Sequence, residues 1–422
     1  MPDAIADGTV MVESDAPNPM IIPAAEAARA RDVPAFARLL FGLAARLNEG
    51  VIDFEAPDGR IFRFGGRNPG PSTKIVLKNW RPLRRVIWGG NVGWAESYVD
   101  GEWDSPDVAA FLDLVSRNTD HLREVFRASL LPRIANRLGH VLRLNSRRGA
   151  KRNIHAHYDL GNAFYARWLD PTMTYSAARF AAPGEDLSDA QRNKYRALAD
   201  MIALRPDQTL LEIGCGWGGF AEYAARERGA RVTGITISRE QHDFAKRRMF
   251  EAGLAERADI RLVDYRDVEG QFDRIASIEM FEAVGERYWP AYFAKIHESL
   301  KSGGAAGLQV ITIADRHFPI NRRSVDYIQK NVFPGGMLPS PCVLRQQMAQ
   351  AGLEWREAVA FGPDYARTLA EWRVRFLAAW DDIRRMGFDE RFRRLWTYYL
   401  SYCEAGFRSG STDVLQVAAV RT

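Results

Sequence analysis

The chain has 422 residues, of which 46% are hydrophobic and 26% are charged, with a formal net charge of +5 at pH 7. The length favours two domains, and the composition is typical of a globular protein. No run of about 18 or more uncharged apolar residues occurs, which excludes a membrane-spanning helix. The 3 cysteines, at 215, 342 and 403, form no CxxC, which argues against a disulfide framework and a zinc site and fits a reducing cytoplasm.

We expect the first 33 residues to form a loosely ordered leader. They contain several acidic residues and lack a basic start followed by an apolar block, so they do not resemble a secretory signal.

Residues 34–130 predict a small mixed α/β domain. Strand-like segments at 51–54 and 61–64 are separated by turn residues at 57–59 and 65–66. Residues 104–107 (DSPD) then supply an N-cap and early acids for a helix whose apolar face includes Phe111 and Leu114.

A basic stretch follows, and residues 131–152 are predicted to link the two domains. No Asp or Glu occurs between Arg133 and Arg152, so this stretch favours an anionic surface, either bilayer headgroups or nucleic acid. A solvated basic linker is the alternative. No zinc-knuckle, RRM or helix-turn-helix signature accompanies it, so we expect no nucleic-acid partner.

From Asp207 onward the pattern alternates strand, Gly-rich turn and helix, which predicts an open parallel sheet. The predicted strands are 209–213, 231–236, 260–263, 272–278 and 306–312.

A Gly-rich loop, residues 212–219 (EIGCGWGG), follows the first of these strands and opens a helix. Its glycines allow backbone N–H groups to approach a ligand. The loop lacks the Gly-Lys-Ser/Thr ending of a phosphate loop and the spacing of a dinucleotide fingerprint. Glu212, just before the first glycine, suits a ligand with an ammonium group.

Residues 214–218 (GCGWG) resemble the first motif of class I S-adenosylmethionine methyltransferases. Further motifs narrow the resemblance to the cyclopropane-fatty-acyl-phospholipid synthase family: 157–162 (HYDLGN), 175–176 (YS), 234–241 (GITISREQ), 280–285 (MFEAVG), 333–340 (FPGGMLPS) and 361–365 (FGPDY). The resemblance covers residues 153 to about 420 and implies an α/β class I methyltransferase fold: a Rossmann-like, mostly parallel sheet with helical insertions in a catalytic domain, 153–422, beside the smaller N-terminal domain.

The resemblance implies S-adenosylmethionine as co-substrate. It places Tyr175 and Ser176 at the methionine portion, Gly214 and Gly216 beneath the ligand, Thr236, Ser238 and Gln241 near the ribose, and Tyr265 and Arg266 beside the adenine. Acceptors, a carboxylate and aromatic faces suit a cationic ligand with a flat base.

At the reacting end, methylation of an alkene leaves a carbocation, which carboxylates and aromatic faces stabilise. In the family, a Cys, a Glu, a His and a Tyr bind a bicarbonate ion that takes the proton. Glu282 and Tyr365 stand at two of these positions, but Ala177 and Ile311 replace the Cys and the His. The sequence therefore leaves bicarbonate binding open, and with it the choice between a cyclopropane and a methyl- or methylene-branched product.

Glu279 stands where family members often have Gly, three residues before Glu282. If both lay on one helical turn, their repulsion would raise the proton affinity of one of them. We hypothesise that Glu279 or Glu282 is the base; the alternative is that Glu279 only braces the loop or caps a helix. Gln309 lies two residues before the missing His.

Residues 93–104 (GWAESYVDGEWD) resemble the N-terminal lipid-associated domain of the phospholipid enzymes, which the mycolic-acid relatives lack. This favours an unsaturated phospholipid as substrate and peripheral binding to an anionic membrane surface, on the inner face in the cytoplasm. The resemblance also leaves a homodimer or larger homo-oligomer as an expectation.

Several alternatives stay open. A small-molecule amine methyltransferase shares much of the pattern, and a non-catalytic lipid-binding relative would need a spoiled cofactor site. His155 and His157 have strand spacing, but no nearby ligand set completes a metal site, so we expect no metal. The aromatic residues of the last helices either line an acyl channel or form core: Trp372, Phe376, Trp380, Trp396, Tyr398 and Tyr399.

Overall fold

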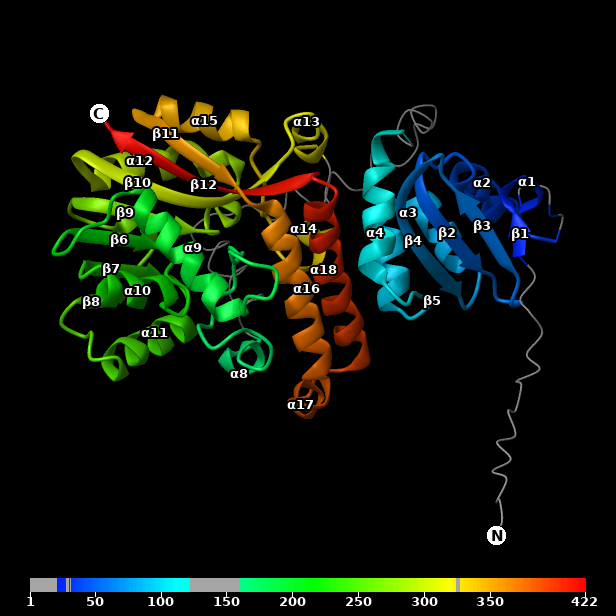
Figure 1. Cartoon of the computed structure of the whole chain (residues 1–422), viewed down its shortest axis with the longest axis horizontal. Coiled ribbons are helices and arrows are strands. Elements are labelled where there is room, and N and C mark those ends of the chain that lie inside the picture. Colours follow the sequence, from blue (N-terminus) through cyan, green and yellow to red (C-terminus); the bar gives the residue numbers. More distant parts are fainter. Residues whose placement is uncertain (1–20, 28–29, 31, 122–159, 324–326) are drawn as a thin grey trace, which may run out of the picture.

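The computed structural model describes residues 21–27, 30, 32–121, 160–323 and 327–422. They form two units, each built on its own sheet (Figure 1). The N-terminal unit comprises the described residues up to 121, and the C-terminal unit comprises those from 160 onward. The predicted basic linker, His155 and His157 lie outside the described residues.

The N-terminal unit contains a five-stranded sheet in the order β1-β3-β2-β4-β5. Its strands are β1 (Ile21–Pro23), β2 (Glu49–Glu55), β3 (Ile61–Gly65), β4 (Asn68–Leu77) and β5 (Trp103–Asp104). Alternate residues of β2 are buried, as expected for a sheet with one covered face. The two strands predicted at 51–54 and 61–64 are confirmed, whereas the structure assigns part of the predicted leader to β1, which pairs with β3.

The helices of this unit are α1 (Ala24–Ala27), α2 (Ala35–Ala44), α3 (Arg81–Val99) and α4 (Val108–Arg117). The Asp107 side chain caps α4 by accepting a hydrogen bond from the Ala110 backbone N–H, which confirms the predicted N-cap. The helix α3 is kinked at Gly90, whose φ of 55° and ψ of −143° are not helical.

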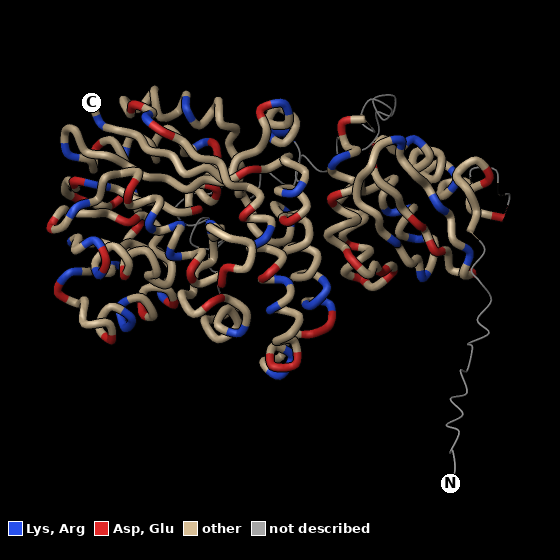
Figure 2. The backbone as a smooth tube through the Cα atoms, in the orientation of Figure 1, with Lys and Arg blue, Asp and Glu red and all other residues tan. Residues whose placement is uncertain are grey.

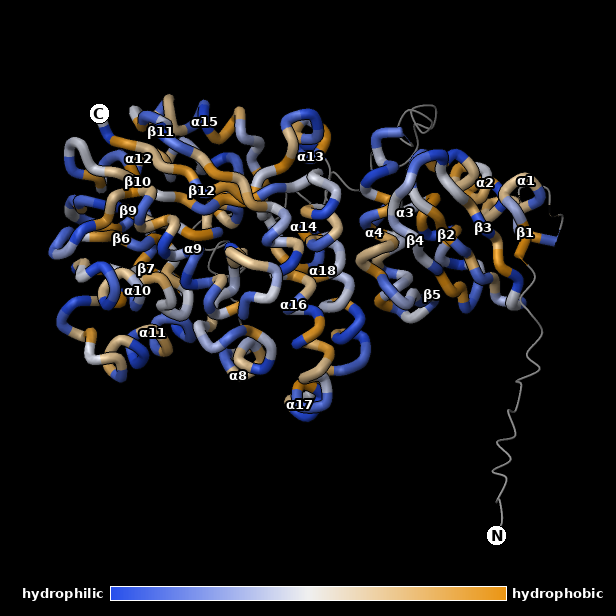
Figure 3. The backbone as a smooth tube through the Cα atoms, viewed as in Figure 1, coloured by the Kyte–Doolittle hydropathy of each residue, from blue (hydrophilic) through white to orange (hydrophobic). Residues whose placement is uncertain are grey.

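The C-terminal unit contains a seven-stranded sheet in the order β11-β12-β10-β9-β6-β7-β8. Its strands are β6 (Thr209–Ile213), β7 (Arg231–Thr236), β8 (Ala258–Leu262), β9 (Phe272–Ile278), β10 (Leu300–Ile313), β11 (Leu353–Ala360) and β12 (Thr412–Arg421). The pairs from β10 to β8 are parallel, as predicted, but β12 is antiparallel to both of its neighbours. The strands β6, β10 and β12 are rich in apolar residues (Figure 3).

The principal helices of this unit are α9 (Leu187–Met201), α10 (Gly219–Glu227), α11 (Arg239–Glu251), α12 (Trp289–Ser299), α15 (Pro341–Gln350), α16 (Gly362–Ala378) and α18 (Glu390–Arg408). Shorter helices are α8 (Asn162–Tyr165), α13 (Phe318–Asn321), α14 (Tyr327–Asn331) and α17 (Trp380–Arg385). The helices α16 and α18 run beside each other between the seven-stranded sheet and the N-terminal unit (Figure 1).

The helix α18 joins the two units by contacting α3 and α4. The buried Arg394 guanidinium donates hydrogen bonds to the backbone oxygens of Tyr98 (2.5 Å) and Trp103 (2.6 Å). It also lies 4.0 Å from the centroid of the Tyr98 ring. Tyr398 belongs to the same apolar core as the N-terminal unit, so the two units share packed residues.

Charged residues of both signs are interspersed along the described chain (Figure 2). Within the described ranges, no helix combines the length and apolarity needed to cross a membrane.

Candidate active site

A cavity of about 750 Å³ lies at the carboxyl ends of the parallel strands. Its walls include the segments that follow β6, β7, β8 and β9, together with residues of α18 and of the N-terminal unit. In open α/β sheets this edge is where ligands bind, because the connecting loops leave a crevice there.

The Gly-rich loop between β6 and α10 lines this cavity with Gly214 and Gly216. Gly214 has a φ of +81°, and a Cβ at this position would lie 2.8 Å from Cγ of Met280. Gly216 has a φ of +53°, and no heavy atom lies within 4 Å of the place where its Cβ would be. The loop therefore turns tightly against Met280 and leaves open space above Gly216 for a ligand.

Glu212, at the end of β6, supplies a buried carboxyl group to the cavity. Burial raises the pKa of Glu212 to about 8, against the lowering effects of Lys194 and Arg248. Its Oε2 has no hydrogen-bond partner among the described residues. A buried carboxyl oxygen of this kind fits the ammonium group of a ligand.

Tyr175 and Ser176 also line the cavity. The Tyr175 hydroxyl lies 2.7 Å from the Tyr399 hydroxyl, and Ser176 Oγ accepts a 2.7 Å hydrogen bond from Lys194 Nζ. Lys194 is fully buried, and burial lowers its pKa to about 7. Lys194 could not be recognised as a site residue from its sequence pattern, because a lysine in an amphipathic helix normally faces solvent.

Thr236, the last residue of β7, and Gln241, near the start of α11, also line the cavity. Thr236 Oγ1 donates a 2.9 Å hydrogen bond to Gln241 Oε1. Ser238 is not among the residues that line the cavity; its hydroxyl caps α11 by accepting from the Gln241 backbone N–H. Ser238 thus fixes the connection between β7 and α11, which lies between the other two residues.

Tyr265 and Arg266 line the cavity after β8. The Arg266 guanidinium makes a bidentate contact to Asp264, at 2.8 and 2.6 Å, and lies 5.5 Å from the centroid of the Tyr265 ring. Asp264 therefore fixes the arginine against this aromatic ring.

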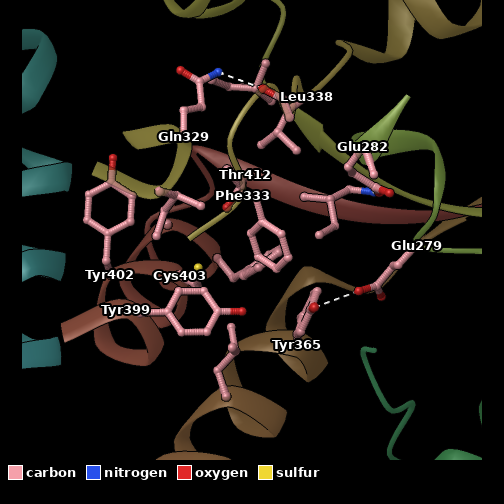
Figure 4. A pocket seen from close by; sticks show the side chains of 18 of the residues that line it. Glu279, Glu282, Gln329, Phe333, Leu338, Tyr365, Tyr399, Tyr402, Cys403 and Thr412 are labelled. Atoms are coloured by element: carbon pink, nitrogen blue, oxygen red, sulfur yellow. Dashed lines mark hydrogen bonds between the residues drawn. The ribbon is translucent and has the colours of Figure 1, made fainter. Parts of the chain in front are cut away.

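Glu279 directly follows β9 and lines the cavity with a partly buried carboxylate. Its Oε1 accepts hydrogen bonds from the Ala177 backbone N–H (2.9 Å) and Gln309 Nε2 (2.8 Å), and its Oε2 accepts one from the Tyr365 hydroxyl (2.6 Å) (Figure 4). Its φ of +47° is an unusual backbone conformation for a residue other than Gly, Asn or Asp. Burial raises the pKa of Glu279, and the donated hydrogen bonds oppose this rise.

Glu282 lies in the short 3₁₀ helix Phe281–Ala283. Burial and the charge of Glu279 raise its pKa to about 8, and its Oε2 has no hydrogen-bond partner among the described residues. The sequence-based picture of both glutamates on one helical turn is wrong, because Glu279 lies before this helix with a positive φ. The predicted electrostatic coupling between the two carboxyl groups is nevertheless present.

The two positions that lack the family's Cys and His still contact these glutamates through the backbone. The Ala177 N–H donates to Glu279, and the Ile311 N–H donates a 2.5 Å hydrogen bond to Glu282 Oε1. Each replacement thus removes a side-chain donor while its backbone N–H binds a carboxylate.

An aromatic and apolar wall faces Glu279 across the cavity (Figure 4). Tyr399 and Phe333 belong to it, and Tyr398 also lines the cavity. Of the other aromatic residues considered for an acyl channel, Trp372, Phe376 and Trp396 are buried in the core. Periodicity alone could not separate these two groups, since α18 carries members of both.

Residues 145–417 match the family model described as mycolic acid cyclopropane synthetase. The chain is 40% identical over 372 residues to tuberculostearic acid methyltransferase of Mycobacterium tuberculosis, covering 85% of each chain. It is 37% identical over 389 residues to cyclopropane-fatty-acyl-phospholipid synthase of Escherichia coli, covering 88% of this chain and 96% of that protein. The structure resembles that of a mycolic acid cyclopropane synthase complexed with SAH and CTAB, with a TM-score of 0.60 and 28% identity, over 64% of this chain and 98% of that one.

Proposed function

This chain belongs to the mycolic acid cyclopropane synthetase family, and we propose that it methylates the cis double bond of an unsaturated acyl chain in a membrane phospholipid. It is an S-adenosylmethionine-dependent methyltransferase with a class I fold that modifies lipid acyl chains. The observation that carries the proposed chemistry is the Glu279 carboxylate, which three donated hydrogen bonds hold at the cavity wall.

The residues around the Gly-rich loop fit S-adenosylmethionine. Glu212 offers a carboxyl oxygen to its ammonium group, Gly216 leaves open space, and Tyr265 offers an aromatic face. When bound, S-adenosylmethionine supplies an electrophilic methyl group. We assign its binding to Tyr175, Ser176, Glu212, Gly214, Gly216, Thr236, Gln241, Tyr265 and Arg266, with Ser238 acting through the loop that it caps.

The reacting end must stabilise a positive charge, because an alkene carbon that gains a methyl group leaves its former partner cationic. The ionised Glu279 carboxylate supplies the opposing charge, and Tyr399 and Phe333 supply aromatic faces. The Tyr365 hydroxyl positions Glu279 by its 2.6 Å hydrogen bond. These donors use three of the roughly four lone-pair sites of a carboxylate, which leaves one on Oε2 for a substrate proton.

We propose a methylene-branched product. A hydride shift from the methylated carbon to the cationic carbon moves the charge to the carbon that bears the new methyl. Transfer of one methyl proton to Glu279 then leaves a double bond between the chain carbon and the new branch carbon, so the chain gains CH₂ overall. Loss of that proton before the shift would instead close a cyclopropane ring.

Two observations support the branched product over the ring. Ala177 and Ile311 remove the side-chain donors of the bicarbonate site, and Glu279 is bound to the backbone at position 177. The relative named tuberculostearic acid methyltransferase is also slightly more similar to this chain than the cyclopropane synthase, at 40% against 37% identity. We therefore infer that a protein carboxylate takes the place of the bound anion.

The phospholipid assignment rests on the N-terminal unit. The phospholipid synthase is matched over 96% of its length, whereas the mycolic acid enzyme is matched over 98% of its own length but only 64% of this chain. We infer that the N-terminal unit serves a lipid held in a bilayer. The protein would then act at the inner face of the cytoplasmic membrane as a peripheral protein.

The test is to incubate the protein and S-adenosylmethionine labelled with ¹³C in the methyl group with vesicles of dioleoyl phosphatidylglycerol. NMR of the purified lipid is expected to show the vinylidene protons of a methylene branch. High-field ring protons would contradict the branched product, and labelling only of added soluble amines would contradict the lipid substrate.

Glu279→Gln tests the base, since the amide keeps the shape of the side chain but cannot take the proton. We expect a loss of about 100-fold or more in kcat, which is the lower range for general-base catalysis. Glu251→Gln, at an exposed position on α11, is the matched control and should retain full activity. Full activity of Glu279→Gln would refute its role as the base.

A further inference from the structure

One arm of the cavity extends from the reacting end into the N-terminal unit. Its lining there includes Leu40, Leu43 and Ala44 of α2, Val86 of α3 and Leu114 of α4. The polar residues of the N-terminal unit that line the cavity are Asn91, Ser116 and Thr119, and none of its charged residues does so. This arm therefore fits a neutral, apolar ligand.

The apolar core of the N-terminal unit is open to the cavity. Phe111 and Leu114 are buried, yet they line the cavity as well as the apolar core. Protein interiors are normally packed with few voids, because an empty apolar space forfeits dispersion contacts. The apolar space that the cavity leaves beside this core therefore points to a ligand that fills it.

Two large apolar side chains are exposed on the same helices. Leu39 is 60% exposed and directly precedes the lining residue Leu40. Trp88 is 75% exposed and lies between the lining residues Val86 and Asn91, next to the kink at Gly90. Tryptophan favours the interface between the bilayer and water, because its ring is apolar and its N–H is polar.

We infer that the N-terminal unit contains the passage through which the acyl chain leaves the bilayer and reaches the reacting end, with Leu39 and Trp88 at its membrane side. This inference rests on the proposed function, and it gives the N-terminal unit a direct role in holding substrate. The two units keep this passage in place through the Arg394 hydrogen bonds to Tyr98 and Trp103.

Two adjacent alanines provide a matched test. Ala44 lines the cavity, whereas Ala45 is exposed and does not. Ala44→Trp fills the passage, and Ala45→Trp adds the same side chain outside it. Leu40→Trp is a second filling variant at a partly exposed position, in case Ala44→Trp fails to fold, as checked by circular dichroism.

Two readouts are measured on each variant: methyl transfer to dioleoyl phosphatidylglycerol vesicles, and binding of the fluorescent fatty acid cis-parinaric acid. Each CH₂ group that can no longer be buried lowers affinity about fourfold, so excluding two or more gives about tenfold or greater losses. We expect such losses in both readouts for the filling variants, with the Kd for S-adenosylmethionine within twofold of the wild type. Ala45→Trp should match the wild type.

Unchanged parinaric acid binding in a folded filling variant would overturn the passage. Wild-type protein that binds parinaric acid, loses it on filling and yet methylates no vesicle lipid would support the passage and contradict the proposed function. The two proposals therefore fail separately.

Discussion

Removing the Tyr365 hydroxyl should change the pH at which Glu279 becomes active. The 2.6 Å hydrogen bond lies within the range of charge-assisted O–H···O⁻ bonds. Such bonds contribute about 1.5–3 kcal/mol, and about 1.4 kcal/mol corresponds to one pKa unit. Because the hydroxyl stabilises the ionised carboxylate, it lowers the pKa of Glu279 relative to burial alone. Tyr365→Phe should therefore raise this pKa by about one to two units.

The assay is the pH dependence of kcat for methyl transfer to vesicle lipid at saturating S-adenosylmethionine. A base acts only when ionised, so the acid limb of the profile should move to higher pH by about one to two units in Tyr365→Phe. Tyr399→Phe is the matched control, because the Tyr399 hydroxyl contacts Tyr175 rather than a glutamate. An acid limb that stays in place, or moves to lower pH, would refute the assignment of Glu279 as the ionised base.

Three further changes test other parts of the site. Gly214→Ala should lower the free energy of unfolding by about 1–2 kcal/mol, because Gly214 has a φ of +81° and the added Cβ would clash with Met280. It should also weaken S-adenosylmethionine binding; thermal denaturation and calorimetry measure the two effects. Glu282→Gln should keep kcat within about tenfold of the wild type at pH 7, because a pKa of about 8 already keeps Glu282 protonated there; a loss as large as that of Glu279→Gln would contradict this. Lys194 has a pKa of about 7 in the folded protein and 10.5 as a free side chain, so its contribution to stability is present above pH 10.5 and is lost as the pH falls towards 7. Lys194→Met should make the unfolding free energy depend less steeply on pH across this window, and an unchanged slope in urea denaturation would refute the burial argument.

The parallel part of the C-terminal sheet was predictable from the sequence, because its strands are short segments that contain apolar residues and are separated by turn and helix signals. The antiparallel β12 was not predicted, since its place between β10 and β11 depends on long-range pairing rather than on a local pattern. In the N-terminal unit, β4 begins with Asn-Pro-Gly-Pro, which reads locally as a turn. Its pairing with β2 overrides that local preference.

The same division holds for the site. The Gly-rich loop, Glu282 and Tyr365 lie in recognisable motifs, so they could be predicted from the sequence as candidate site residues. The positive φ of Glu279 and the burial of Lys194 could not be predicted, because both depend on how distant segments pack. Gln416 illustrates this point: its side chain, on β12, donates 3.1 Å hydrogen bonds to Gln309 Oε1 and to the Lys194 backbone oxygen. It thereby orients the amide that binds Glu279.

Glu279 and Glu282 differ in the number of hydrogen bonds that their carboxyl groups accept. Two carboxylates in one apolar site cannot both ionise cheaply, because each charge lacks solvent and repels the other. Glu279 accepts three hydrogen bonds, whereas Glu282 accepts one at Oε1 and has no partner for Oε2 among the described residues. We therefore expect the charge to reside on Glu279, whereas the pKa of about 8 keeps Glu282 protonated at neutral pH. Under the proposed function, the negative charge of Glu279 would oppose the positive charge of the acyl cation, and Glu279 would take a proton when that cation decays.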